Sequence, residues 1–85
     1  MTKHYISLDG FSRNKEDDEK ISKDINALFS TPNGKQVLQY FKSITIETVN
    51  GPNVTDNELR HLEGQRYLVG LISRRINHAN KMRIK

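Results

Sequence analysis

The chain has 85 residues, a formal net charge of +4 and no cysteine. At this length a single domain with a small core is expected, which leaves little room for an enclosed active site. The lack of cysteine excludes disulfides and cysteine-based zinc sites, and no stretch reaches the roughly 20 apolar residues that cross a membrane. We therefore expect a small soluble protein that is not bound to a membrane.

Positive charge is concentrated at the C-terminal end. Residues 60–85 hold 7 basic groups and 1 acidic group, whereas residues 1–59 hold 7 basic and 9 acidic groups. Attraction to an acidic partner or to nucleic acid is therefore expected from the last third of the chain.

Residues 1–15 show no clear hydrophobic period. Polar and glycine positions interrupt their apolar side chains, which are Tyr5, Ile6, Leu8 and Phe11. We predict a flexible, extended N-terminal arm that can dock its aromatic rings on the domain or on a neighbour.

The first predicted helix begins near residue 16, with Asn14 as its cap and four acidic residues, 16–19, in its first turn. Carboxylates there complement the helix dipole. We prefer this interpretation to a metal site, because we find no converging second set of ligands. The apolar stripe of this helix consists of Ile21, Ile25, Leu28 and Phe29.

A second helix is predicted to start at Pro32, since proline suits the first helical position after a Thr31 cap. Its apolar positions are Val37, Leu38, Phe41 and Ile44, with Tyr40 beside them. The two helices should form a short αα-hairpin. The β-branched stretch 45–49 is either the end of this helix, which we favour, or a short extended piece.

The third predicted helix is the longest, and Thr55 and Glu58 fit a capping box at its start. Its apolar stripe consists of Leu59, Leu62, Val69, Ile72 and Ile76. We predict an all-α fold: a helical hairpin followed by one long C-terminal helix, with a helical domain at 16–80 and a basic tail at 81–85. The residues expected to share one core are Ile25, Phe29, Val37, Phe41, Leu62, Val69 and Ile76.

The opposite side of the long helix is a predicted interaction surface, because a helix that is apolar on two sides requires burial on both. This partner face comprises Arg60, Gly64, Tyr67, Leu71 and Arg74, and it would bind another subunit, another protein or nucleic acid. Gly64 and Gly70 each cost the helix about 1 kcal/mol relative to alanine. Close approach of another backbone and neutral drift explain these glycines equally well.

Gln65 and Arg66 flank the apolar stripe as candidate structural polar groups. Arg66 either donates to the last carbonyls of the first helix, near residues 29 and 30, or lays its stem along the core with its head in water. A basic group near the C-terminus consists of Arg74, Arg75, Lys81, Arg83 and Lys85. It either contacts nucleic-acid phosphates or forms a solvated or protein-binding basic end.

Motifs for catalysis or cofactor binding are missing. His4, His61 and His78 lack a metal-ligand spacing. The sequence contains no nucleophile elbow, no phosphate-binding glycine-rich loop and no acid–base carboxylate pair. We therefore predict no enzymatic activity, no metal and no cofactor.

Two motifs carry a resemblance to a known family: an LF-x-T-P-x-G turn at residues 28–34 and a G-Q-R helix that starts at residue 64. Over residues 24–80 the chain resembles a family of tailed-bacteriophage proteins encoded among head, portal and packaging genes. The resemblance implies a role in the virion or in its morphogenesis, in the host cytoplasm during assembly or in the particle, without enzymatic activity.

Two main functional hypotheses result. In the first, the chain is a small structural or assembly protein that binds copies of itself or a larger head or portal protein. In the second, it is a DNA-binding accessory, either a packaging subunit like a small terminase or a regulator, with non-specific DNA contacts at its basic end. A regulator or inhibitor of an enzyme is a third, less favoured class.

Overall fold

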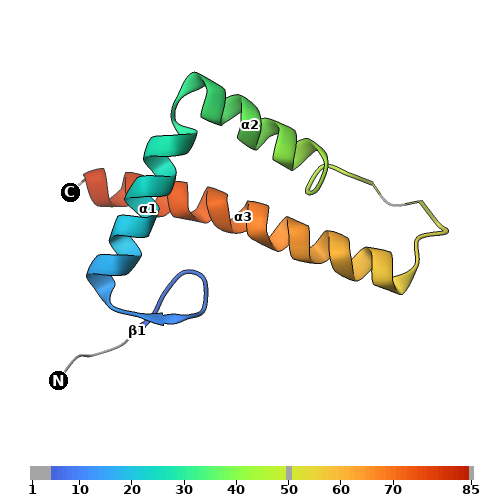
Figure 1. Ribbon diagram of the computed structural model, residues 1–85, viewed down its shortest axis with the longest axis horizontal. Helices are drawn as coiled ribbons and strands as arrows, with labels where there is room; N and C mark the ends of the chain where they lie inside the picture. The colour runs from blue at the N-terminus through green and yellow to red at the C-terminus, as the bar shows by residue number, and fades with distance from the viewer. Residues whose placement is uncertain (1–4, 50, 85) are drawn as a thin grey trace.

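The computed structural model describes residues 5–49 and 51–84, with side chains as far as Met82. Within these residues a small β-hairpin precedes three helices (Figure 1). The strands are β1 (Tyr5–Ile6) and β2 (Ser12–Arg13), and the helices are α1 (Lys15–Phe29), α2 (Pro32–Ser43) and α3 (Asp56–Ile84). The predicted all-α architecture, two short helices and then a long one, is confirmed. Because α3 continues to Ile84, residues 81–84 belong to the helix and not to a separate tail.

The three helices begin at the residues that their capping signals indicate. Asn14, Thr31 and Thr55 each accept, through a side-chain oxygen, the backbone N–H three residues further on, at 2.9, 2.9 and 3.1 Å. Pro32 occupies the first turn of α2, where its missing N–H costs nothing. After α2 the chain continues as turns at residues 44–47, so this stretch is neither a strand nor a regular helix end.

The elbow between α1 and α2 explains the LF-x-T-P-x-G pattern. A Cβ on Gly34 would lie 2.1 Å from the Leu28 carbonyl oxygen and 2.8 Å from the Phe29 Cα. Both neighbours are backbone atoms that cannot move aside, so only glycine fits there. Thr31 caps α2 through Gly34 and also donates its hydroxyl to the Leu28 carbonyl at 3.0 Å. The motif is therefore a structural requirement of the elbow.

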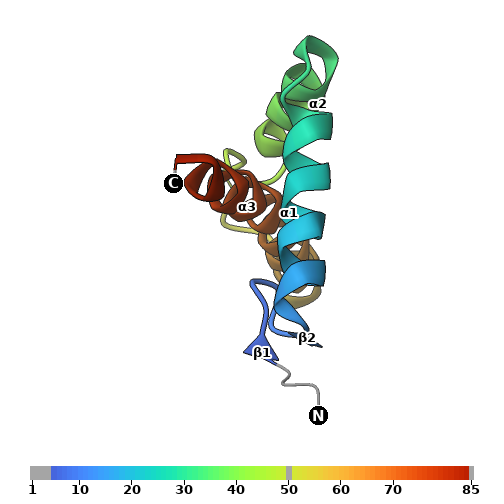
Figure 2. The same ribbon diagram turned by 90° about the vertical axis from the view of Figure 1, so that its left-hand side faces the viewer.

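Helix α1 crosses the C-terminal half of α3, and the side of α1 that is buried there is polar (Figures 1 and 2). Its buried residues are Asp18, Ser22 and Asn26. Ser22 and, on α3, Ala79 are small and almost fully buried, at 0% and 1% exposure, which allows close helix contact. The predicted apolar stripe of α1 is therefore not its buried side. Three members are only half-buried and Leu28 is 62% exposed.

The apolar core is small. In the described part of the chain only Leu38, Val69 and Ala79 are buried hydrophobic residues. Of the residues predicted to share the core, Val69 is buried, and five others are half-buried. Val37 is 44% exposed, and Leu38 takes the inward position on α2. The prediction that Val37 belongs to the core is wrong, because the buried side of α2 is centred on Leu38.

The N-terminal segment differs from the extended arm that the sequence indicated. Residues 5–13 form an antiparallel hairpin in which Tyr5 pairs with Arg13 and Ile6 pairs with Ser12. Gly10 makes the turn with a φ of 84°, a conformation that favours glycine. The hairpin folds back toward α1 and α3, and the Tyr5 hydroxyl donates to Asp18 at 2.7 Å. Positions 1–4 of the predicted arm lie outside the described residues.

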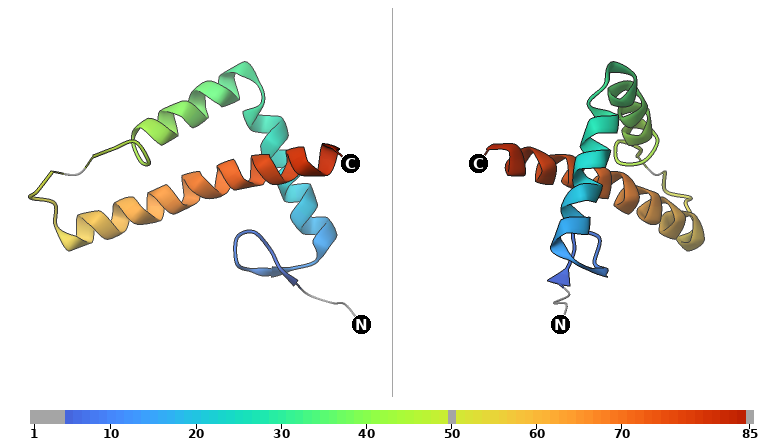
Figure 3. Two further views of the ribbon diagram at one scale, coloured as in Figure 1. Left: turned by 180° about the vertical axis from the view of Figure 1, so that it is seen from behind. Right: turned by 60° about the vertical axis from the view of Figure 1, so that its left-hand side comes forward.

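The molecule is thin and open. Its dimensions are 51 × 34 × 17 Å, and the shortest is less than two helix diameters of about 10–12 Å. The radius of gyration is 15.5 Å, against about 12 Å for a compact chain of this length. The N-terminal half of α3 extends beyond α1, with α2 and the following loop on one side of it (Figure 3, left). Each helix therefore has a face that no other part of the described chain covers.

Candidate interaction surfaces

The predicted partner face of α3 is largely accessible. Arg60, Gly64 and Arg74 are exposed, Tyr67 is 55% exposed and Leu71 is half-buried. A Cβ on Gly64 would meet no atom within 4 Å. The same is true of Gly70, so no other backbone within the described chain closely approaches these glycines. Leu68, next to this face, adds another 59% exposed side chain.

The N-terminal hairpin touches the C-terminal part of the partner face. The Tyr67 hydroxyl donates to the Asp9 carbonyl at 3.4 Å, and the Arg74 guanidinium donates to the Leu8 carbonyl at 3.3 Å. Both hydrogen bonds are long, so they hold the hairpin only weakly at this point. The part of the partner face that the hairpin does not touch is therefore its N-terminal part, with Arg60 and Gly64.

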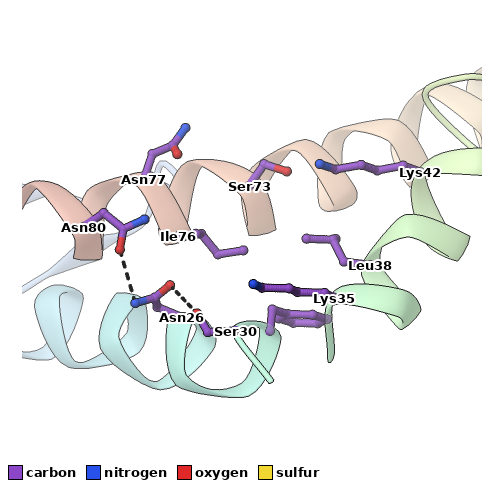
Figure 4. Close-up of a pocket in the computed structure, with 10 residues that line it drawn as sticks. Asn26, Ser30, Lys35, Leu38, Lys42, Ser73, Ile76, Asn77 and Asn80 are labelled. Atoms are coloured by element: carbon purple, nitrogen blue, oxygen red, sulfur yellow. Dashed lines mark hydrogen bonds between the residues drawn. The ribbon is translucent and has the colours of Figure 1, made fainter. Parts of the chain in front are cut away.

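A groove of about 400 Å³ lies where the three helices approach one another (Figure 4). Apolar side chains of all three helices contribute to it, namely Phe29, Leu38 and Ile76. The remaining lining is polar: Asn26, Ser30, Lys35, Lys42, Ser73, Asn77 and Asn80. Its volume falls within the range of about 300–1,000 Å³ typical of ligand-binding pockets.

The groove carries positive charge without a nearby negative partner. Figure 4 shows Lys35 and Lys42 extending from α2 into the groove. None of the described residues that line it is acidic, and neither lysine takes part in an ion pair among them. The Ser73 hydroxyl is buried and has no hydrogen-bond partner in the described part of the chain. The groove therefore suits a ligand with negative groups and hydrogen-bond acceptors.

Arg66 joins α3 to the end of α2. Its Nε donates to the Thr45 carbonyl at 2.8 Å, and a terminal nitrogen donates to the Thr48 carbonyl at 2.7 Å. It also pairs with Glu63 at 2.7 Å. Of the two interpretations left open for Arg66, donation to carbonyls agrees with these hydrogen bonds, but the acceptors follow α2 and are not the expected carbonyls near residues 29 and 30 of α1. Gln65, by contrast, is exposed, so it does not have the structural role predicted for it.

Arg75 is buried, which removes it from the candidate DNA contacts. Its residue exposure is 1%, and one guanidinium nitrogen donates to the Asp18 carboxylate at 2.5 Å and to the Asp18 carbonyl at 2.9 Å. The same nitrogen reaches the Ser22 hydroxyl at 3.0 Å, and the other lies 3.4 Å from Asp9. Two carboxylates and a hydroxyl stabilise its charge, so Arg75 cannot bind phosphate at the surface.

The same network shifts the pKa of three groups. Hydrogen bonds from Arg13 and Ser7 hold the pKa of Asp9 far below its usual range. Burial favours protonation of Asp18, but the Tyr5 and Arg75 hydrogen bonds outweigh it and lower its pKa. Partial removal from water and the hydrogen bond to Asp18 raise the pKa of Tyr5 to about 12. Asp9 and Asp18 are therefore negatively charged at neutral pH, and their contacts with Arg75 join the hairpin and α1 to α3.

The remaining basic residues form a smaller group than predicted. Arg74 and Lys81 are exposed. Lys85 lies outside the described residues, as does the side chain of Arg83. His78 faces α1, and its Nδ1 lies 2.7 Å from the Ser22 hydroxyl.

Neither a metal site nor a membrane span is present in the described part of the chain. The described residues contain no group of three histidine, aspartate or glutamate side chains placed to hold a metal ion. Nor is any helix among them long and apolar enough to cross a membrane.

Sequence reasoning missed both the groove and the buried polar network. The stripe Lys35, Leu38, Lys42 was visible, since its spacing of three and four places the residues on one side of a helix. The contacts of Arg75 with Asp9 and Asp18 span 66 and 57 positions. No local pattern indicates such a contact.

The comparisons with known proteins give one match. The model of the family described as Bbp19-like phage protein matches residues 25–81, two thirds of the chain. That range contains α2, the last third of α1 and most of α3, including the Gly34 elbow and the groove. No curated protein and no solved structure matches the chain. The chain therefore belongs to the Bbp19-like phage protein family.

Proposed function

We propose that this phage protein is a small, non-catalytic structural or assembly protein that binds copies of itself or a larger head or portal protein. It would act in the host cytoplasm during particle assembly and could remain in the virion. The observation that carries this proposal is the amount of apolar surface that the folded chain leaves exposed. Among the residues whose side chains are described, twelve large hydrophobic residues are at least 38% exposed, against three buried hydrophobic residues. Contiguous exposed apolar surface is typical of protein–protein contact sites.

The distribution of these residues supports assembly through more than one surface. On α2, Val37 and Tyr40 are 44% and 60% exposed, and Ile44, directly after the helix, is 49% exposed. On α3, Tyr67 and Leu68 are the most exposed apolar side chains. A chain with two such surfaces can join two neighbours, which is what a repeated component of a particle requires.

The partner face of α3 remains our candidate for one of these contacts. Tyrosine and arginine are enriched at interface hot spots, and Arg60, Tyr67 and Arg74 provide them beside the small Gly64. Replacing Tyr67 by Gln and Leu71 by Glu should give a folded protein that associates less than the parent, because the contact made by this face is lost. Light scattering of this variant beside the parent chain measures the effect.

DNA binding is the alternative, and the cations available for it support it less well. Arg75 is buried and Arg66 is bound to backbone carbonyls, so Arg74 and Lys81 are the exposed cations of the basic end within the described side chains. Without an array of groups that read base edges, such binding would be weak and non-specific.

The proposal is tested by quantitative mass spectrometry of purified particles and of assembly intermediates such as procapsids. We expect the chain in at least one of them, at a constant ratio to the major head protein. The ratio measured before and after genome release separates a structural component from a DNA-bound one, because a DNA-bound protein leaves with the genome. Absence from every particle and intermediate would contradict the proposal.

A further inference from the structure

The groove has a charge pattern that specifies its occupant. Lys35, Leu38 and Lys42 are spaced by three and four residues and therefore lie on one side of α2. The two lysine Cα atoms are separated by about 10.5 Å along the helix axis, from a rise of 1.5 Å per residue. Leu38 between them is 8% exposed and forms part of the groove wall. A matching ligand presents two negative charges about 10 Å apart with an apolar group between them.

The first two turns of α3 carry the complementary pattern. Asp56, Leu59 and Glu63 have the same spacing of three and four residues, so they also lie on one side of a helix. All three are exposed: Leu59 is 38% exposed and the Glu63 side chain is 59% exposed. Glu63 pairs with Arg66 at the edge of this surface. Because the Glu63 carboxylate is exposed to solvent, the ion pair is weak, and the carboxylate can also contact a second cation.

These two surfaces cannot meet within one chain. The start of α3 lies at the far end of the molecule from the elbow between α1 and α2 (Figure 3, left). We infer that the groove of one copy receives the first two turns of α3 from a second copy, with Leu59 entering the groove and Asp56 and Glu63 facing the two lysines. This inference rests on the proposed assembly function and names its partner and contact.

The pattern favours a protein over a phosphate group as the occupant. Two lysines whose Cα atoms lie about 10.5 Å apart along α2 match two separated negative groups better than a single phosphate. The groove is also lined by apolar side chains, including Leu38 and Ile76. A nucleic-acid backbone has no apolar group to pack against them. Because the contact uses different surfaces on the two copies, it is heterologous and produces a ring or a filament.

The test is a charge swap followed by sedimentation velocity at physiological salt. One variant, Lys35→Glu/Lys42→Glu, reverses the groove, and a second, Asp56→Lys/Glu63→Lys, reverses the helix start. Each should sediment as a monomer under conditions in which the parent associates, because like charges then face each other and weaken the contact by at least roughly 100-fold. Mixed in equal amounts, the two variants should associate again, since each supplies the charge that the other now lacks. Circular dichroism confirms that both are folded.

The control is Lys15→Glu/Lys23→Glu, which makes the same charge change at two exposed positions that do not line the groove. It should associate like the parent. A groove variant that sediments like the parent, or a mixture that stays monomeric, would overturn the inference. So would a parent chain that is monomeric at all concentrations, since another protein or DNA would then occupy the groove. The proposed function itself is tested separately, by the presence of the chain in particles and intermediates, so the two failures are distinguishable.

Discussion

Removal of the Asp18 carboxylate should strongly destabilise the fold. The side chains of Arg75 and Asp18 are only 2% and 4% exposed, and truncating one member of a buried ion pair typically costs about 3–5 kcal/mol. We expect about 3 kcal/mol for Asp18→Ala, because Asp9 still lies 3.4 Å from Arg75. A chain of this size has roughly 4–13 kcal/mol of total stability, so the loss is a large part of it. The melting temperature should fall by roughly 12–24 °C.

Equilibrium unfolding in urea measures this effect, with the m-value checking that the transition stays two-state. Adding Arg75→Met to the first change should recover much of the loss, since an apolar side chain does not leave a buried charge. Asp24→Ala is the matched control, because its pair with Lys20 is exposed and should be worth less than about 1 kcal/mol. An Asp18→Ala variant within about 0.5 kcal/mol of the parent would refute the structural role of this network.

Three further predictions concern the elbow, acid stability and DNA. Gly34→Ala should lower the free energy of unfolding, measured in urea, by at least about 2 kcal/mol, because the new Cβ clashes with the backbone. Gly64→Ala should raise the same free energy by up to about 1 kcal/mol, because alanine favours the helix. Equal effects of the two substitutions would contradict the elbow geometry. Because folding lowers the pKa of Asp9 and of Asp18, their ionised carboxylates stabilise the fold above about pH 3.9, the usual pKa of aspartate in an unfolded chain. This stabilisation is lost as the pH falls below about 4 toward the lower pKa values of the folded state. Thermal melts between pH 7 and pH 3 should therefore show a loss that is smaller in Asp9→Asn. The log–log salt slope for duplex DNA should not exceed about 4 in magnitude, because only four cations of the basic end remain available; a steeper slope in a binding titration would contradict this.

Local chemistry was the predictable part of this fold. The caps at Asn14, Thr31 and Thr55 depend on residues within three positions of each other, and each was found where the sequence indicated it. Pro32 and the length of α3 followed from equally local signals. The close approach at Gly34 explains a motif that the sequence displayed but could not interpret.

The buried side of α1, the charge of the groove and the burial of Arg75 depend on tertiary contacts, which local sequence patterns do not reveal. Hydrophobic periodicity favoured the apolar side of α1, yet α1 buries Asp18, Ser22 and Asn26 because Arg75 on α3 requires acceptors there. Once that side of α1 faces inward, Leu28 must point outward. The positive charge of the groove likewise depends on how α2 is placed against α3, a long-range property. The assignment of Arg75 as a surface cation was wrong for the same reason.

The most direct test of the assembly role is deletion of the gene from the phage, with the protein supplied from a plasmid. We predict that the deleted phage still replicates its DNA and makes its major head protein, but accumulates incomplete particles and loses infectious titre. The parent protein should restore the titre, whereas the folded variant Tyr67→Gln/Leu71→Glu should not. Normal yields of complete, infectious particles from the deleted phage would contradict an assembly function for this protein.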